Sequence, residues 1–144
     1  MRLPLWGVVL SVCSVAIFSA EAGEIYSGSR EILKTESTVL GEKLSYPGGG
    51  PAEIRSLIIV IAPGEETKWH KHPVPLYAYV LSGTLTVDYG DKGKRTYQSG
   101  EAFMEAMDQW HRGQNDGKEP VQLVTVFLGG ENRPISVPRE ESRP

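Results

Sequence analysis

Three histidines, His70, His72 and His111, are the residues of this 144-residue chain whose types and spacing are best suited to chemistry. His70 and His72 are separated by one residue in the segment WHKH. On a β-strand, residues i and i+2 point to the same face, so these two imidazoles are expected side by side. Imidazole is a common metal ligand. The spacing therefore predicts half of a metal site, with His111 as the third ligand.

Cysteine usage limits the chemistry of any such site. The only cysteine, Cys13, lies in the apolar segment at the start of the sequence. Disulfides, cysteine nucleophiles and thiolate ligands are therefore not expected in the rest of the chain. A bound metal ion is expected to use nitrogen and oxygen ligands.

The first 22 residues have the pattern of a secretory signal peptide. One early positive charge is followed by an apolar run over residues 3–20, and Ala20 and Ala22 stand at the −3 and −1 places of an A-x-A cleavage site. We expect cleavage before Gly23 and a periplasmic or secreted protein without stable membrane insertion. The alternative is an uncleaved anchor, because the apolar run is just long enough to span a bilayer.

Composition points to one domain that does not bind nucleic acid. The net charge is −3, and lysine and arginine are scattered singly along the chain. A nucleic-acid surface would need a basic stripe or patch, which this pattern lacks. About 120 residues can bury a core without disulfides or structural metal ions. We expect a small organic ligand or substrate as the partner.

The elements that must position the histidines are short strands. The 16 glycines and 10 prolines fall between short apolar stretches, a rhythm typical of an all-β sandwich or closed barrel. Residues 29–40 are consistent with a short helix or an edge strand. We expect an N-terminal arm and edge strand over residues 23–50, a barrel over 51–130 and a tail over 131–144. The predicted strands are residues 54–62, 67–72, 76–81, 84–89, 95–98, 102–105, 110–113 and 121–128.

The glycines and histidines also follow two known motifs. The segment GEETKWHKHPVPLYAYVLSG, from Gly64 to Gly83, resembles the first motif of the cupin superfamily. The segment GEAFMEAMDQWHRGQN, from Gly100 to Asn115, resembles the second. The resemblance implies an all-β, single-domain jelly-roll barrel of the cupin type. It also implies one divalent metal ion, Fe, Mn, Zn, Ni or Cu, held by the three histidines.

The chain departs from these motifs at one chemically important place. The metal-binding glutamate of the first motif falls on Leu76, which cannot bind a metal ion. Glu105 occupies a place where the second motif has an apolar, inward-facing residue, and a carboxylate there is costly unless it is paired or bound. Glu105 is therefore the candidate fourth ligand or catalytic general base. The alternatives are that Glu105 turns to solvent or pairs with Arg112. Two lesser departures, Ala106 for proline and Asp108 for glycine, affect only a turn.

Three functions remain open at this level. The first is a metalloenzyme acting on a small organic molecule, an oxygenase, isomerase or hydrolase. The second is a non-catalytic exported binder of a small ligand or metal ion. The third keeps the histidines for structure alone. Cupins often pair through edge strands, so a homodimer is a further expectation. Five aromatic residues are expected to fill the barrel: Trp69, Tyr77, Tyr79, Phe103 and Trp110.

Overall fold

The computed structural model describes residues 31–45, 51–130 and 132–140. The predicted signal segment and its cleavage site lie outside these residues. Within them, no helix is long and apolar enough to cross a membrane.

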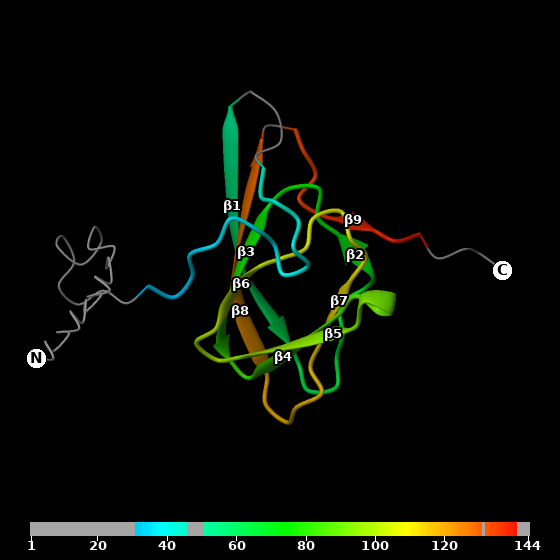
Figure 1. Cartoon of the computed structure of the whole chain (residues 1–144). Coiled ribbons are helices and arrows are strands. Elements are labelled where there is room, and N and C mark those ends of the chain that lie inside the picture. Colours follow the sequence, from blue (N-terminus) through cyan, green and yellow to red (C-terminus); the bar gives the residue numbers. More distant parts are fainter. Residues whose placement is uncertain (1–30, 46–50, 131, 141–144) are drawn as a thin grey trace, which may run out of the picture. The chain divides into compact units, whose positions relative to one another are not determined.

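The described chain consists almost entirely of antiparallel β-structure (Figure 1). Within the described ranges, the only helical element is a 3₁₀ turn, η1 (Gly90–Lys92). The largest sheet has four strands in the order β1 (Ala52–Ile61), β8 (Val121–Gly130), β3 (Leu76–Ser82) and β6 (Ala102–Met104). The second sheet has three strands in the order β5 (Lys94–Gln98), β4 (Thr84–Asp88) and β7 (Arg112–Gln114). The third is a pair, β2 (His70–Lys71) and β9 (Val137–Pro138).

The two larger sheets share one core because their strands alternate between buried and exposed side chains. In β3, Leu76, Ala78 and Val80 are buried, while Tyr77 and Tyr79 between them are only half-buried. The same period of two runs through β8 and β4. The core contains buried residues from both sheets: Ile61, Ala78, Val80, Leu85, Val87, Tyr89, Phe103, Ala106, Val121 and Leu123. The prediction of an all-β jelly-roll barrel is confirmed.

The segment that carries the first two histidines extends the second sheet. Thr67 donates its backbone N–H to the carbonyl of Gly113, and His70 and His111 exchange backbone hydrogen bonds of 2.9 Å. The chain therefore runs along β7 before β2 begins. The predicted strand over residues 67–72 is reduced to the two residues of β2, because the rest of this segment pairs only through isolated bridges.

Two predictions about the ends of the domain need correction. Residues 31–40 contain neither a helix nor a strand. Ser37 forms an isolated bridge with Lys43, and Val39 donates its N–H to the carbonyl of Met104 on β6. The segment expected as a tail contains β9, in which Pro138 faces His70 and Val137 faces Lys71. Neither contact could be predicted from the residues of its own segment, because each one pairs with residues that are distant in the sequence.

The four-stranded sheet presents an apolar outer face. Ile54, Ile58 and Val60 of the edge strand β1 are 57%, 61% and 58% exposed. Register places Ile58 beside Val124, which lies beside Tyr79, so these side chains share one face. Tyr77 and Tyr79 therefore lie on the outside of the barrel. Of the five aromatic residues expected to fill it, only Phe103 is buried in the core.

Candidate metal centre

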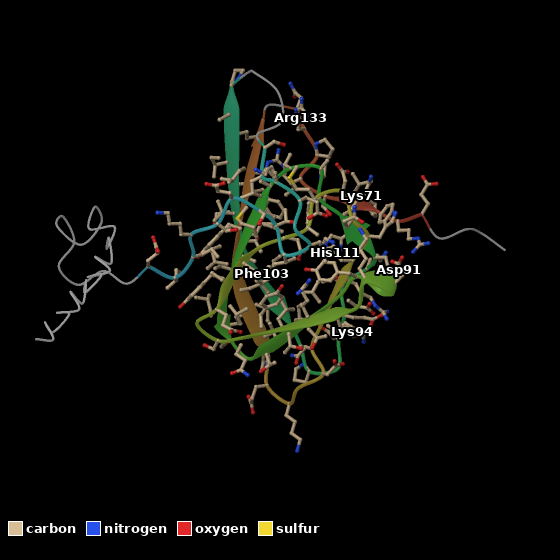
Figure 2. All side chains as sticks on the ribbon, in the orientation of Figure 1. Lys71, Asp91, Lys94, Phe103, His111 and Arg133 are labelled. Carbon is tan, nitrogen blue, oxygen red and sulfur yellow. The ribbon has the colours of Figure 1, made fainter. Side chains whose placement is uncertain are left out.

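The three histidines come together where the segment that contains β2 runs beside the residue that precedes β7, His111. One ring nitrogen from each of His70, His72 and His111 lies within 4.8 Å of the others, the only such group among the described residues. The ring centroids are 4.5 to 5.0 Å apart. In Figure 2, His111 lies inside the fold, whereas Lys71, the residue between the other two histidines, lies at the surface. The alternation predicted for the WHKH segment therefore brings both imidazoles to the same side.

Each imidazole is held by a backbone carbonyl at its Nδ1 atom. Nδ1 of His70 lies 2.7 Å from the carbonyl of Lys68, and Nδ1 of His111 lies 2.9 Å from that of Gln109. Nδ1 of His72 lies 2.7 Å from the carbonyl of Ile135. A carbonyl oxygen can only accept, so all three Nδ1 atoms carry the hydrogen. The Nε2 lone pairs are left free, which is the tautomer that metal-binding histidines need.

Burial keeps the histidines neutral. The exposed fractions of His72 and His111 are 4% and 3%. Desolvation lowers the pKa of His72 to about 3 and lowers the pKa values of His70 and His111 below their ordinary value of 6.5. At neutral pH the site therefore offers lone pairs and no positive charge.

Glu105 follows β6 and points into the same site. The residue is 4% exposed. Its Oε1 atom accepts hydrogen bonds from the Tyr89 hydroxyl at 2.6 Å and the Ala106 N–H at 2.7 Å. Its Oε2 atom lies 3.7 Å from Nε2 of His111. That Nε2 atom carries a lone pair and no hydrogen, so it and the carboxylate oxygen are two hydrogen-bond acceptors that face each other. A cation or a proton between them stabilises this arrangement.

The environment of Glu105 favours its protonated form. Burial raises its pKa from 4.5 to about 7, although the hydrogen bonds from Tyr89 and Ala106 act in the opposite direction. The alternative pairing with Arg112 is not seen. Arg112 instead lies 2.6 Å from Glu66 and 3.4 Å from Asp88 on the outside of the sheet.

Leu76 and Glu105 are neighbours on adjacent strands. The backbone N–H of Glu105 donates to the carbonyl of Leu76 at 2.8 Å, which continues the β3–β6 register. Glu105 is therefore the direct cross-strand neighbour of Leu76, the position at which the first motif has its glutamate. Leu76 is buried and lines the cavity beside the histidines. Whether Glu105 binds a metal ion stays a prediction.

The site opens onto a small, mostly apolar cavity of about 70 Å³ between the two larger sheets. The histidines and Glu105 are its ionisable groups, and Thr67 and Thr125 add hydroxyls. Apolar walls exclude water and strengthen electrostatic interactions inside the cavity. The walls include Ile61, Leu76, Leu85, Phe103, Leu123 and Phe127.

Two groups at the site were not predicted. Tyr89 directly follows β4 and continues the alternation of the buried residues Leu85 and Val87, and this period was a usable signal for its inward direction. The carbonyl of Ile135 left no signal, because every residue has a backbone carbonyl. Asn115 lies in a turn, as its place in the motif suggests, and it donates to the carbonyls of Ile61 and Glu119.

Asp108 shows how the chain accommodates one departure from the second motif. Its φ of 53° lies in the left-handed region, which the usual glycine enters without cost. Aspartate is among the few other residues that tolerate this region. Its carboxylate lies 3.1 Å from the ammonium of Lys71, so the turn is also held by an ion pair.

The donor set fits a divalent first-row metal ion. Three neutral imidazole nitrogens and a nearby carboxylate suit Zn, Fe, Mn, Ni and Cu, and three protein ligands leave positions open for a small molecule. The same donors do not select one of these metals over another. Selectivity depends on geometry and supply.

Comparison with known proteins agrees with this architecture. A family profile described as a cupin domain matches residues 57–127. No curated protein matches the chain. Among solved structures, an uncharacterized protein with a double-stranded β-helix domain from Klebsiella pneumoniae is 22% identical. The match covers 66% of this chain and 90% of that one, with a TM-score of 0.52.

An oxalate decarboxylase from Lactobacillus farciminis, solved as a formate complex, is 23% identical with a TM-score of 0.52. The match covers 59% of this chain and 26% of the decarboxylase, so this chain spans about a quarter of that protein. At this level of identity, both structures are evidence for the fold alone.

Proposed function

We propose, from the premise that the chain belongs to the cupin superfamily, that it is a metalloenzyme that transfers protons on a small organic substrate. The observation that carries this proposal is geometric: the ring nitrogens of three neutral histidines converge, and Oε2 of the buried Glu105 lies 3.7 Å from Nε2 of one of them, His111. A carboxylate held this close to a metal-binding group is placed to take up or release a proton of a bound substrate. Structural histidines would not need three free lone pairs turned toward one another.

His70, His72 and His111 would hold the metal ion, and Glu105 would be either a fourth ligand or the general base. When bound, the ion supplies a Lewis acid that polarises a carbonyl group. As a carboxylate, Glu105 accepts a proton at Oε2 from the substrate, and as a carboxylic acid it returns that proton. Tyr89 and the Ala106 N–H keep Oε1 fixed while Oε2 faces the cavity. This exchange of one proton supports isomerase- or hydrolase-type chemistry.

The cavity restricts the substrate to a small molecule. Its volume of about 70 Å³ is roughly half of the 150 Å³ in which an engineered protein cavity holds benzene. The group that enters is therefore smaller than a benzene ring. A short carboxylic acid with an adjacent carbonyl group meets both the size and the chemistry.

Proton transfer can be tested directly with pyruvate in D₂O. Protein loaded with Zn²⁺ or Mn²⁺ is expected to exchange the methyl protons of pyruvate for deuterium, observed by ¹H NMR, and to stop after chelation. Glu105→Gln should abolish the exchange. A non-catalytic binder would broaden the pyruvate resonances without deuterium incorporation, and that result would replace the enzyme proposal by a binding one.

We also propose export to the periplasm or the medium, supported by the leader-like pattern of residues 1–22. Expression of the full chain in a bacterial host, followed by intact-mass measurement, tests this. A mature form that begins at Gly23 is expected. A product that still begins at Met1 would contradict it.

A homodimer is proposed through the open edge of β1. Among the described residues, β1 pairs only with β8, so its second edge is open to a second copy. Edge pairing about a twofold axis would join the two four-stranded sheets into one continuous sheet, and the exposed side chains of Ile54, Ile58 and Val60 would then pack beside those of the second β1. Light scattering should give the mass of a dimer, and Ile58→Lys should give a monomer. A wild-type monomer at micromolar concentration would refute the pairing.

A further inference from the structure

We infer that residues 132–140, here called the C-terminal clasp, are part of the metal site, because the Ile135 carbonyl positions His72 for metal binding. This inference rests on the proposed metal centre. It adds a positioning group from a segment that the cupin-domain match, over residues 57–127, does not include. The consequence is that metal binding and docking of the clasp stabilise each other.

The clasp is attached to the site at three points. Strand β9 pairs with β2, the strand that carries His70. The Arg139 N–H donates to the carbonyl of Trp69 at 2.8 Å. The Ile135 side chain packs on a second small core formed by Val74, Leu76 and Phe127. The docked clasp thereby places the Ile135 carbonyl 2.7 Å from Nδ1 of His72.

His72 depends on the clasp in a way that the other two histidines do not. The carbonyls that hold His70 and His111 lie two residues away along the chain, so they stay in place with their own segments. The carbonyl that holds His72 comes from 63 residues away. When the clasp leaves, the His72 N–H at Nδ1 loses its acceptor inside a buried site. The ring can then move the hydrogen to Nε2, the atom that must be free to bind a metal ion.

The coupling must act in both directions. A metal ion on Nε2 requires the hydrogen on Nδ1, which strengthens the hydrogen bond to Ile135 and favours the docked clasp. By linkage, the factor by which the clasp raises metal affinity equals the factor by which the metal ion raises clasp docking. A segment that merely covered the small core of Val74, Leu76 and Phe127 would show no such reciprocity.

Two altered chains and two controls test the inference. One altered chain ends at Asn132, and the other keeps its full length with Ile135→Asp, which removes the apolar contact without shortening the protein. The controls are a chain ending at Glu140 and Ile135→Val, which keeps an aliphatic side chain. Zn²⁺ affinity is measured by competition with a chromophoric chelator, and the Co²⁺ absorption spectrum reports the ligand field.

Loss of a group that orients a metal-binding histidine typically costs about 10-fold to 100-fold in affinity, and this is the loss expected in both altered chains. Both controls should keep the affinity of the unaltered protein, and the Co²⁺ spectrum should change only in the altered chains. In the unaltered protein, Zn²⁺ should slow hydrogen exchange at the Arg139 amide by a similar factor, a measurement that needs no variant.

Equal Zn²⁺ affinity in the altered chains, or exchange at Arg139 that ignores Zn²⁺, would overturn the role of the clasp and leave the metal centre intact. If the unaltered protein binds neither Zn²⁺ nor Co²⁺, the proposed metal centre itself fails, and the inference fails with it.

Discussion

The substitution Glu105→Gln tests two effects of the buried carboxylate: it should destabilise the metal-free fold, and it should stabilise a bound metal ion. Burial raises the pKa of Glu105 from 4.5 to about 7. Each pKa unit corresponds to 1.36 kcal/mol, so ionised Glu105 should cost the metal-free protein about 3 kcal/mol. The folded-state pKa is the higher one, so the contribution of Glu105 to stability is fully present below pH 4.5 and is lost as the pH rises through 7.

Glutamine cannot ionise, yet its side-chain oxygen can still accept the hydrogen bonds of Tyr89 and the Ala106 N–H. Metal-free Glu105→Gln should therefore be more stable than the unaltered protein at pH 8, by about 3 kcal/mol, and the difference should fall to less than about 1 kcal/mol at pH 5. Urea denaturation in the presence of a chelator at both pH values measures the difference.

Metal binding should stabilise the unaltered protein more than it stabilises Glu105→Gln. A cation beside Oε2 stabilises the carboxylate that burial penalises, so added Zn²⁺ should raise the midpoint of denaturation less for Glu105→Gln than for the unaltered protein.

The matched control is Glu66→Gln, which removes one carboxylate from the outer surface. Glu66 pairs with Arg112 there, and an exposed pair is typically worth about 1 kcal/mol or less. The reasoning is refuted if Glu105→Gln is the less stable protein at pH 8 and responds to Zn²⁺ as the unaltered protein does.

Further predictions concern the histidines, the tyrosine and one turn. His72→Ala should lose bound Zn²⁺, as measured by elemental analysis of the purified protein. Burial lowers the pKa of His72 to about 3, so the unaltered metal-free protein should lose stability as the pH falls from 6.5 toward 3, by at most about 1.4 kcal/mol per pH unit for this group. Denaturation at several pH values checks this, and His72→Gln should reduce the slope. Tyr89→Phe removes a hydrogen bond that lowers the pKa of Glu105, so the pH at which metal-free stability declines should move upward. Gly83→Ala should destabilise the fold by more than about 1 kcal/mol in urea denaturation, because the new Cβ would meet the Pro120 carbonyl oxygen at 2.9 Å and φ is +78°.

The sequence was most informative where a side-chain pattern repeats over several residues. Short apolar stretches between glycines and prolines made the strands around Ala78 and Val87 predictable, and the i, i+2 spacing of His70 and His72 predicted their shared direction. The site was less predictable where it depends on main-chain atoms or on distant pairing. The Ile135 carbonyl has no side-chain signature, and β9 contains a proline, which argues against a strand when read alone.

For Glu105, the sequence motif predicted the direction of the side chain but not its hydrogen-bond partner. Its inward direction was inferred from the motif position and the cost of burying a charge, with solvent exposure as an open alternative. Its hydrogen bond with Tyr89 joins the residue that follows β6 to the residue that follows β4, and no local spacing links the two. Pairing across strands, rather than composition, decides which polar groups meet inside a barrel.

The hydrogen bond between Glu105 and Leu76 also has an evolutionary consequence. Because Leu76 and Glu105 are backbone neighbours and both line the cavity, two substitutions would exchange the acid between the two strands, and the cavity would have one acid at the same wall before and after the exchange. An intermediate with acids at both positions would hold two like charges together, and one with neither would lack an acid there, so each order of substitution crosses a different functional state. Lineages that have made this exchange can be recognised by scoring the two positions as a pair, even though each one, taken alone, departs from the family pattern.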